Sequence, residues 1–580
     1  MGKGDDLKGQ EPDKGKVADV SGSRKEADDV LYRDLGMADS QRADRLSDMF
    51  AGQGGLSKGW SGKGWSGKGW SGKGWSADDP TELSFGAARA SDSGLLKRMP
   101  TLEDLDTLKK IGAVFNNVDA AKHLPDAGKG TTPSKSEAIA PMKAWEIPGE
   151  IGKIFNKVDV NGDGKLDLNE LGRAVQDTAY TGKAAQALAA LYSSRGALAG
   201  SGDAISKESL SKLSDLKDLS DLLPTFDTVG KIGKLLLDSK LFPYKADGVT
   251  KETLLQRSQD KDLPPAEKIL LTQAVNSFDD LKRLSGSNSD GLTSDGVRRL
   301  RDLASEYPDV ALTKKLELIT NSVSDAQKFD TSQLFSDSGW FGWFKTPAIV
   351  PEAIQQGTVE DCNLMAPMAS LAKFDSAKLR NMITDAGNGE FKVTFPGVPD
   401  EPITVKAPSQ AELGLYSQAT EHGIWPAVIE KAFGEYVRRH PDTVGLTVPP
   451  CTAGAPAAEC LSQGGYWEVV NILTGKEAQV IDLRNKLDSG FAQQLKDSLD
   501  RNAVITIASK DLLLREPGDV IQNLHDYSVL GFDPNGPGGG TLILRDPYGK
   551  RSPTGENTIN VRADRLRADF DWIAVEGKDK

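Results

Sequence analysis

The sequence predicts an α+β protein, and three changes of residue pattern along the chain support this prediction. Residues 1–100 are rich in Gly, Ser, Asp and Lys and poor in periodic apolar positions, which is typical of a disordered N-terminal tail. Residues 101–330 repeat apolar positions at helical spacing, so we expect an all-α domain. Residues 331–580 begin helical and then alternate apolar and polar positions, as strands do, so we expect a domain of helices and strands.

Length and charge exclude several classes of protein. A chain of 580 residues is too long for one hydrophobic core and predicts two or three folded units. The formal net charge of −13 argues against a chain that is basic overall and wraps nucleic acid. No apolar run is long enough for a transmembrane helix. The polar N-terminus lacks the apolar core of a standard signal peptide, so we expect a cytoplasmic protein or one exported without a Sec signal.

The predicted tail contains a short exact repeat. Each of four tryptophans follows Lys-Gly and precedes Ser, namely Trp60, Trp65, Trp70 and Trp75. The frequent glycines oppose a stable helix, so these rings cannot form a core stripe. Exposed tryptophans and lysines can dock on a partner groove, a single-stranded nucleic acid or a membrane interface. A passive linker enlarged by repeat slippage explains the repeat equally well, and the sequence leaves both interpretations open.

The helical region contains an internal repeat. The segment Ile111–Asp119 recurs as Ile151–Asp159 with six of nine positions identical, which predicts a repeated helix-loop unit. Weaker copies follow at Gly202–Leu210, Asp247–Glu252 and Asp290–Asp295.

The segment Asp159–Glu170 matches a twelve-residue EF-hand loop, whose crowded hard oxygens suit Ca²⁺. The alternative is a polar turn between helices. The expected ligands are the side chains of Asp159, Asn161, Asp163 and Glu170, the backbone carbonyl of Lys165, and Asp167 through a water. The segment after Asp119 and the weaker copies lack a full ligand set, so we expect them to keep only a packing role. Because EF-hands usually work in pairs, we expect a degenerate mate for the intact loop.

Cys362 stands at the transition from a loop into an apolar helix. A helix N-terminus stabilises a thiolate, so this position predicts a nucleophile with a lowered pKa. The side-chain amide of Gln356, shortly before it, can donate to a developing oxyanion.

A thiolate nucleophile needs a base and a group that orients the base. Of the four histidines, His525 stands at the edge of one expected strand, and Asp546 follows another. Adjacent strands would bring these two side chains together, so that the carboxylate fixes the imidazole. The order of Cys362, His525 and Asp546 along the chain is similar to the papain-type arrangement.

Five segments between about residues 333 and 575 resemble the calpain-type cysteine proteases, in the correct order. They are Gln356-Gly357 with Asp361-Cys362, Trp425–Phe433, Gly464-Gly465 with Leu473–Gly475, His525–Gly531 and Arg545–Gly549. The resemblance implies a two-lobed papain/calpain-like protease core and endopeptidase activity on a protein substrate in the cleft between lobes. It also implies that Gln356 and the backbone amide of Cys362 form the oxyanion hole.

Several positions depart from the family pattern. Glu360 replaces a glycine and adds negative charge, Asn363 replaces a tryptophan that walls the cleft, and Pro367 interrupts the helix. Asp546 replaces an asparagine and Tyr548 a tryptophan, and both exchanges are mild. A catalytically inactive, calcium-dependent interaction module is therefore a rival hypothesis.

Two further alternatives remain. In the first, the tryptophan repeat is the main functional element, a nucleic-acid or cell-surface adhesin, and the protease serves self-processing. The second concerns Cys451 and Cys460, which flank a short loop and are either a disulfide or two reduced thiols.

Overall fold

The computed structural model describes most of the chain from residue 101 onward. The described residues are 101–117, 139–199, 204–237, 248–337, 347–440, 457–461, 466–484, 490–510, 521–549 and 557–578. The expected disordered tail with its tryptophan repeat lies outside them, as do the loop after Asp119, Cys451 and the Gly464-Gly465 pair.

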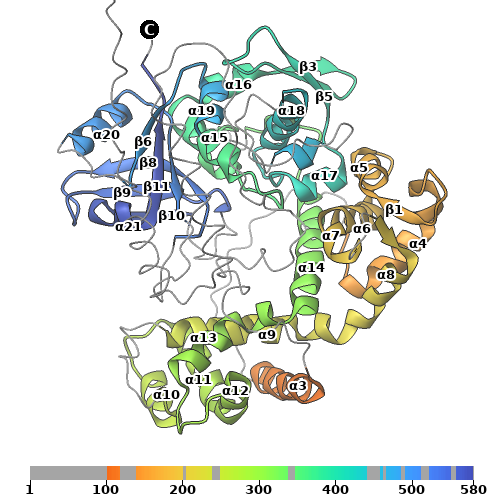
Figure 1. Ribbon diagram of the computed structural model, residues 1–580, viewed down its shortest axis with the longest axis vertical. Coiled ribbons are helices and arrows are strands. Elements are labelled where there is room, and N and C mark those ends of the chain that lie inside the picture. The colour runs from red at the N-terminus through yellow and green to blue at the C-terminus, as the bar shows by residue number, and fades with distance from the viewer. Residues whose placement is uncertain are drawn as a thin grey trace, which may run out of the picture. The chain divides into compact units, whose positions relative to one another are not determined.

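The described residues before residue 330 are helical apart from two very short strands, as the sequence predicts (Figure 1). The two copies of the internal repeat fall in α3 and α4. The helices are α3 (Leu102–Asn117), η2 (Ala144–Glu146), α4 (Ile147–Val158), α5 (Leu168–Gln176), α6 (Gly182–Ser193), α7 (Arg195–Ala199), α8 (Lys207–Lys212), η3 (Leu213–Leu216), α9 (Lys217–Leu236), α10 (Lys251–Ser258), α11 (Pro265–Asn276), α12 (Phe278–Ser285), α13 (Ser294–Asp302), η4 (Leu303–Glu306) and α14 (Pro308–Ala326).

The predicted calcium loop contains a short strand that pairs with a strand of a second loop. Strand β1 (Lys165–Asp167) runs antiparallel to β2 (Ala204–Ser206), with Leu166 opposite Ile205. Both of these side chains are fully buried. The residue that ends each strand caps the next helix, because Asp167 accepts from the Glu170 N–H and Ser206 from the Ser209 N–H. The expected mate of the calcium loop is therefore the copy around residue 204.

The two remaining copies form a second pair of the same kind. Val249 and Leu292 make an antiparallel bridge, with N···O distances of 2.9 and 2.8 Å. Thr250 then caps α10 and Thr293 caps α13, as Asp167 and Ser206 do in the first pair. The weak copies thus keep the apolar bridge position and the helix cap, which are the parts of the unit that packing requires.

The C-terminal region mixes helices and strands, so the predicted α+β class is confirmed. No helix in the described part of the chain has the length and apolar character needed to cross a lipid bilayer. The elements are η5 (Pro351–Ala353), α15 (Cys362–Phe374), α16 (Ser376–Met382), β3 (Ile383–Gly387), β4 (Glu390–Val393), β5 (Ile403–Lys406), α17 (Gln410–Leu415), α18 (Trp425–Arg439), η6 (Ala457–Cys460), α19 (Tyr466–Thr474), β6 (Gln479–Asp482), α20 (Phe491–Asp500), β7 (Ile505–Ser509), β8 (Asp526–Asp533), β9 (Thr541–Arg545), β10 (Thr558–Arg562), η8 (Ala563–Arg565), α21 (Leu566–Asp569) and β11 (Phe570–Val575).

The largest sheet has the order β10-β9-β8-β7-β11-β6, and all neighbouring strands are antiparallel. Helix α15 lies against one face, where the Ser528 hydroxyl donates to the Ala366 carbonyl at 2.7 Å (Figure 1). Because side chains alternate along a strand, Tyr527 points to the opposite face, into a core that includes Phe491 of α20. The sheet is thus covered on both faces, and β8 contacts the helix that begins at Cys362.

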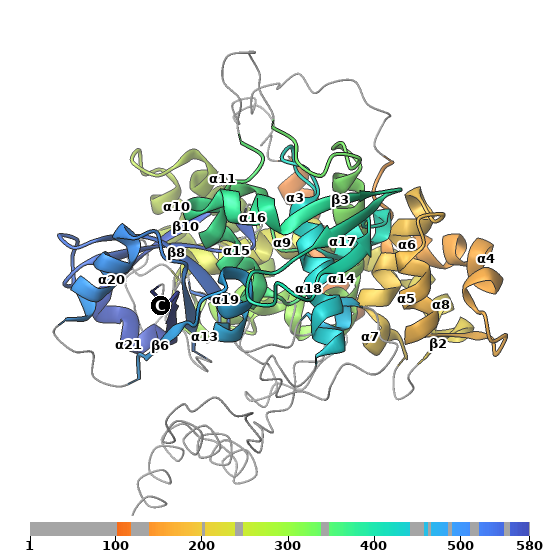
Figure 2. The same ribbon diagram turned by 90° about the horizontal axis from the view of Figure 1, so that it is seen from above.

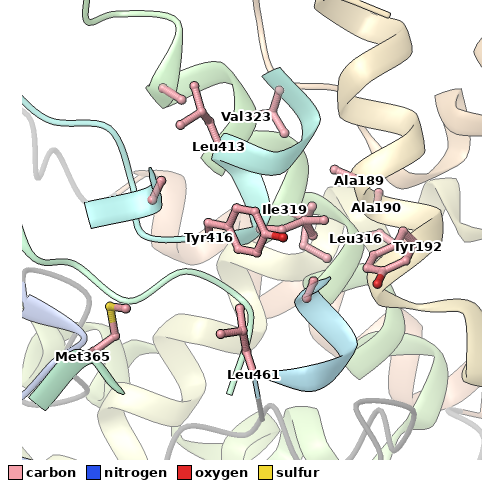
Figure 3. Packing of buried hydrophobic residues seen from close by; sticks show 14 of the residues in the cluster. Ala189, Ala190, Tyr192, Leu316, Ile319, Val323, Met365, Leu413, Tyr416 and Leu461 are labelled. Carbon is pink, nitrogen blue, oxygen red and sulfur yellow. The ribbon is translucent and has the colours of Figure 1, made fainter. Parts of the chain in front are cut away.

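Helix α14 packs against α6 and against α17, and these two helices also contact each other (Figure 2). Leu316 of α14 lies beside Tyr192 of α6, Ile319 lies beside Tyr416, and Val323 lies beside Leu413 of α17 (Figure 3). Tyr416, which follows α17, belongs to the same cluster of buried side chains. Helices α6, α14 and α17 and the residue that follows α17 therefore share one hydrophobic core.

Candidate active site and calcium loop

Cys362 is the first residue of α15 and has a free, half-buried thiol. Asp361 occupies the N-cap position, and its backbone carbonyl accepts from the N–H groups of Leu364 and Met365 at 2.8 and 3.0 Å. The helix begins where the sequence predicts and continues through Pro367 to Phe374. The proline thus lies inside the helix without ending it.

His525 and Asp546 lie side by side, as expected for residues at the ends of adjacent strands. His525 immediately precedes β8, Asp546 immediately follows β9, and the two strands pair. The imidazole Nε2 lies 3.1 Å from Oδ1 of Asp546, and both side chains are buried. Because Nε2 is engaged by the carboxylate, Nδ1 is the ring nitrogen left for another partner.

Aromatic rings hold the imidazole on two sides. The Tyr548 ring stacks on it with a centroid distance of 5.0 Å and an interplanar angle of 3°. Tyr527 meets it edge-on at 4.9 Å. The backbone N–H of Tyr548 also donates to Oδ1 of Asp546 at 2.9 Å. These contacts restrict rotation of the ring, which a base requires if it is to keep one orientation.

The sequence does not reveal a role for Gln522, although it completes this arrangement. Its side-chain amide donates to Oδ2 of Asp546 at 2.8 Å, so the carboxylate is held through both oxygens. Its position just before His525 is the only signal the sequence offers.

Helix α15 packs along β8, which brings Cys362 next to the residue that follows His525. Asp526 and Ser528 are two residues apart on β8, so their side chains point to the same face of the sheet, and the Ser528 hydroxyl contacts α15. Both the carboxyl group and the backbone N–H of Asp526 act on the Cys362 thiol. Among the contacts of the described residues, no hydrogen bond joins the Cys362 sulfur to the His525 ring.

Gln356 is buried in the loop that precedes Cys362. Its backbone N–H donates to the Pro547 carbonyl at 2.9 Å, which ties this loop to the residue after Asp546. Its side-chain amide donates to the Val359 carbonyl at 2.9 Å. The expected oxyanion donor therefore lies at the site, and its amide nitrogen contacts a backbone carbonyl of the same loop.

Gly357 allows this loop to lie against the segment after α17. A Cβ atom at residue 357 would lie 2.0 and 2.1 Å from the carbonyl oxygens of Leu415 and Tyr416. The next backbone N–H, that of Thr358, donates to the Leu415 carbonyl at 2.8 Å. Any larger residue at position 357 would push the loop away from α17.

The electrostatic environment of Cys362 differs from the one that its place at a helix N-terminus predicts. Burial raises the pKa of the thiol well above its usual value, and the acidic side chains of Asp526, Asp361 and Glu360 raise it further. The Asp526 backbone N–H acts in the opposite direction. The expectation of a lowered thiol pKa is therefore wrong for this arrangement, because desolvation and nearby carboxyl groups outweigh the helix terminus.

Two buried carboxyl groups lie behind the nucleophile, and the sequence does not reveal their contact. Asp361 and Glu430 of α18 are both fully buried and interact with each other. Burial raises the pKa of both, that of Asp361 to about 8. Glu430 lies in the segment Trp425–Phe433, whose residue pattern predicts a helix but does not indicate which side chain Glu430 contacts.

In the calcium loop, each acidic ligand candidate is bound to backbone N–H groups. Asp159 accepts from Gly162 and Gly164, at 2.8 and 3.0 Å. Asp163 accepts from Lys165 at 2.8 Å. Both glycines have positive φ angles, of 74° and 79°, which an L-residue with a side chain rarely adopts.

Glu170 reaches back across the loop from α5. One carboxylate oxygen accepts from the N–H groups of Val160 and Asn161, at 2.9 and 3.1 Å, and the other accepts from Asp167 at 3.1 Å. In the described residues no three His, Cys, Asp or Glu side chains converge on one point. The donor set of the loop nevertheless consists of hard oxygens, which is the chemistry that Ca²⁺ takes.

A series of hydrogen bonds connects the calcium loop to the Cys362 loop. Helix α5 follows the calcium loop, and the carbonyl of Val175 near its end accepts from the Ser409 hydroxyl. Ser409 caps α17, where the Glu412 N–H donates to its hydroxyl at 3.1 Å. Helix α17 ends at Leu415, whose carbonyl accepts from Thr358. The two predicted functional elements are thus joined through α5 and α17.

Cys460 is buried in η6 and is disulfide-bonded.

No family model and no curated protein sequence matches the chain.

Proposed function

We propose that this protein is a calpain-like cysteine endopeptidase, with Cys362 as nucleophile, His525 as base and Asp546 as the group that orients the base. One observation carries the proposal. The His525–Asp546 pair, at 3.1 Å, lies at the start of the strand on which the helix beginning with Cys362 packs. The proposal includes the two-lobed papain-like arrangement that the resemblance implies.

The first step is acylation of the sulfur. Nδ1 of His525 takes the proton of the Cys362 thiol, because Nε2 is held by Asp546. The thiolate attacks the peptide carbonyl carbon and forms a C–S bond. The C–N bond then breaks, and the imidazolium returns its proton to the leaving amine.

The second step is hydrolysis of the thioester. His525 takes a proton from water, the hydroxide attacks the acyl carbon, and the C–S bond breaks. The products are a carboxylic acid and the restored thiol. In both steps the oxyanion requires donors, for which the backbone N–H of Cys362 and the Gln356 amide are the candidates. The Gln356 amide would have to leave the Val359 carbonyl to act there.

We also propose that the loop at residues 159–170 binds Ca²⁺, through the six residues named from the sequence. When bound, the ion would supply charge that holds the acidic side chains of the loop around one centre. The hydrogen bonds from Val175 through Ser409 and Leu415 to Thr358 supply a route by which a change in the loop reaches the Cys362 loop. Calcium control of the site is therefore part of the proposal.

A second candidate function is a catalytically inactive, calcium-binding interaction module. The raised pKa of the Cys362 thiol favours it, because a thiol that stays protonated near neutral pH is a poor nucleophile. The two candidates differ in the reactivity of one sulfur. A thiol-reactive peptide inhibitor should label an activated Cys362 quickly. If the thiol is inert, the inhibitor should label it no faster than it labels an ordinary cysteine.

The deciding experiment compares the purified chain with its Cys362→Ala variant, using casein digestion and self-cleavage with and without Ca²⁺. We expect the variant to lose at least about 1,000-fold in cleavage rate while its circular dichroism spectrum and Tm stay unchanged, since nucleophile removal has effects of this order. Equal cleavage by both proteins would overturn the proposal. Absence of cleavage and of inhibitor labelling in the wild type would favour the inactive module.

A further inference from the structure

Asp361 occupies an N-cap position without acting as a cap. An aspartate there normally accepts a hydrogen bond from the first turn of its helix. The side chain of Asp361 makes no such bond, and it is fully buried. It is directed to the carboxyl group of Glu430 on α18.

Within the described part of the chain, no basic side chain is bound to this carboxyl pair. In the described residues, no N–H or O–H donor of another side chain reaches the two Asp361 oxygens or Oε1 of Glu430. Lys431, next to Glu430, is bound to Glu412 at 2.7 Å. Two ionised carboxylates in contact and shielded from water would repel strongly, so one proton between them is the arrangement that chemistry allows.

Other ionisable groups lie next to the pair or next to Cys362 beside it. Tyr416, which follows α17, interacts with Asp361, Glu430 and Glu412, and Cys362 interacts with Asp361, Glu360 and Asp526. Lys431 on α18 is bound to Glu412, and His525 before β8 is bound to Asp546. The neighbourhood therefore favours retention of the proton.

The pair connects the two segments on which the proposed chemistry depends. Asp361 adjoins the nucleophile. Oε2 of Glu430 accepts from the Ser417 N–H at 2.6 Å, and the Ser417 hydroxyl donates to the Gln355 carbonyl at 3.2 Å. The Gln418 N–H reaches the same carbonyl at 3.0 Å. Asp361 thus belongs to the start of α15, and Glu430 is connected to the Gln355–Gln356 loop through Ser417.

We infer that Asp361 and Glu430 share one proton and act as positioning residues, which fix the Gln355–Gln356 loop relative to Cys362. The inference rests on the proposed function of this site. Loss of the shared proton places two carboxylates in contact and separates the loop from the helix. The site is then held together at acidic and neutral pH and loosens at alkaline pH.

The sign of the pH effect follows from the raised pKa. When the pKa of a carboxyl group is higher in the folded state than in the unfolded state, the group stabilises the fold. This contribution is complete at a pH below the unfolded-state pKa. This stabilisation is lost as the pH rises toward the folded value, about 8 for Asp361. We therefore expect Tm to fall as the pH rises from about 4 to about 8, and the proposed cleavage activity to fall as the folded protein loses the shared proton around pH 8.

The test is Glu430→Gln, because a side-chain amide replaces the shared proton with an N–H donor and keeps an acceptor for Ser417. We expect the Tm of this variant to depend less on pH than that of the wild type between pH 5 and 8. With rates normalised at pH 6.5, kcat/KM at pH 9 should exceed that of the wild type by about tenfold, because a group with a pKa of about 8 keeps its proton in only about one-tenth of the molecules at pH 9. Asp361→Asn should also flatten the dependence of Tm on pH.

Glu435→Gln is the matched control on the same helix. Glu435 is bound to Arg438 and Arg439, away from the carboxyl pair, so this variant should keep the pH dependence of the wild type. Parallel Tm curves for wild type and Glu430→Gln would overturn the inference, whatever the activity. A flattened Tm curve in a protein whose wild type cleaves no peptide would support proton sharing and overturn the protease proposal instead.

Discussion

Acidic side chains gather at two places in this protein, the calcium loop and the region behind Cys362, and their environments are opposite. In the loop, Asp163 is exposed and Asp159 half-buried, and each accepts hydrogen bonds from backbone N–H groups. Behind Cys362, Asp361 and Glu430 are fully buried and face each other.

The difference shows how a fold can stabilise crowded negative charge. At the loop, backbone dipoles and access to water leave the carboxylates ready for a cation. In the core, burial makes an ionised carboxylate costly, so protonation is favoured over ionisation. The first site should therefore respond to Ca²⁺ and the second to pH, and three variants test this division.

The largest effect is expected from the loss of calcium binding. Wild-type protein at a Ca²⁺ concentration 100 times its Kd should gain about 2.7 kcal/mol, seen as a rise in Tm. Glu170→Gln should lose most of this gain, because Glu170 carries the only buried carboxylate among the loop ligands. Calorimetric titration and thermal melts with and without EDTA measure both quantities.

Glu208→Gln is the control for this comparison, because Glu208 is exposed on α8, beside the partner strand and outside the loop. It should keep the wild-type response to Ca²⁺. If the wild-type Tm is the same in Ca²⁺ and in EDTA, the loop is a polar turn and the contrast between the two acidic regions disappears.

A smaller effect is expected for Asp526→Asn. Burial raises the pKa of Asp526, so its carboxyl group is neutral at low pH. Once this carboxyl group ionises, its negative charge disfavours the Cys362 thiolate. The variant should react with iodoacetamide at Cys362 up to about tenfold faster than wild type at alkaline pH, since one pKa unit is tenfold. The two rates should converge at acidic pH. A constant ratio across the pH range would show that Asp526 acts on the thiol only through packing.

The smallest effect is expected for Ser409→Ala, which removes the contact between α5 and α17. Loss of this cap and of the hydrogen bond to Val175 should cost about 1 kcal/mol. The variant should also weaken the effect of Ca²⁺ on inhibitor labelling of Cys362. Thr250→Ala removes an equivalent cap from α10 and should lower Tm without changing that response. Equal calcium responses in both variants would disprove the route through α17.

Local patterns predict much of the fold. The residue pattern predicts strands at 503–508, 527–532 and 541–545, and these correspond to β7, β8 and β9 within two residues at each end. The apolar run after Cys362 forms α15, and the helix that the pattern predicts at about 424–439 is α18. These segments are predictable because periodicity and caps act between residues a few positions apart.

Contacts between distant segments were not predictable in the same way. The internal repeat relates the α3 and α4 segments, yet the strand β1 within the predicted calcium loop pairs with Ala204–Ser206. Nothing in the sequence indicates that Glu430 faces Asp361 or that Gln522 holds Asp546. Such contacts depend on how helices and strands pack, which residue patterns along one element do not specify.

The sequence by itself determined the oxygen-bearing side chains of the segment Asp159–Glu170, the start of α15 at Cys362, and the strands that bring His525 to Asp546. Each depends on residue types at fixed short spacings. Only the tertiary structure decided the environment of the thiol, because desolvation and the carboxyl groups of Asp361 and Asp526 arise when α15, α18 and β8 pack together. Burial raises the thiol pKa that a helix N-terminus alone would lower, since the free energy of a charge depends on everything that surrounds it.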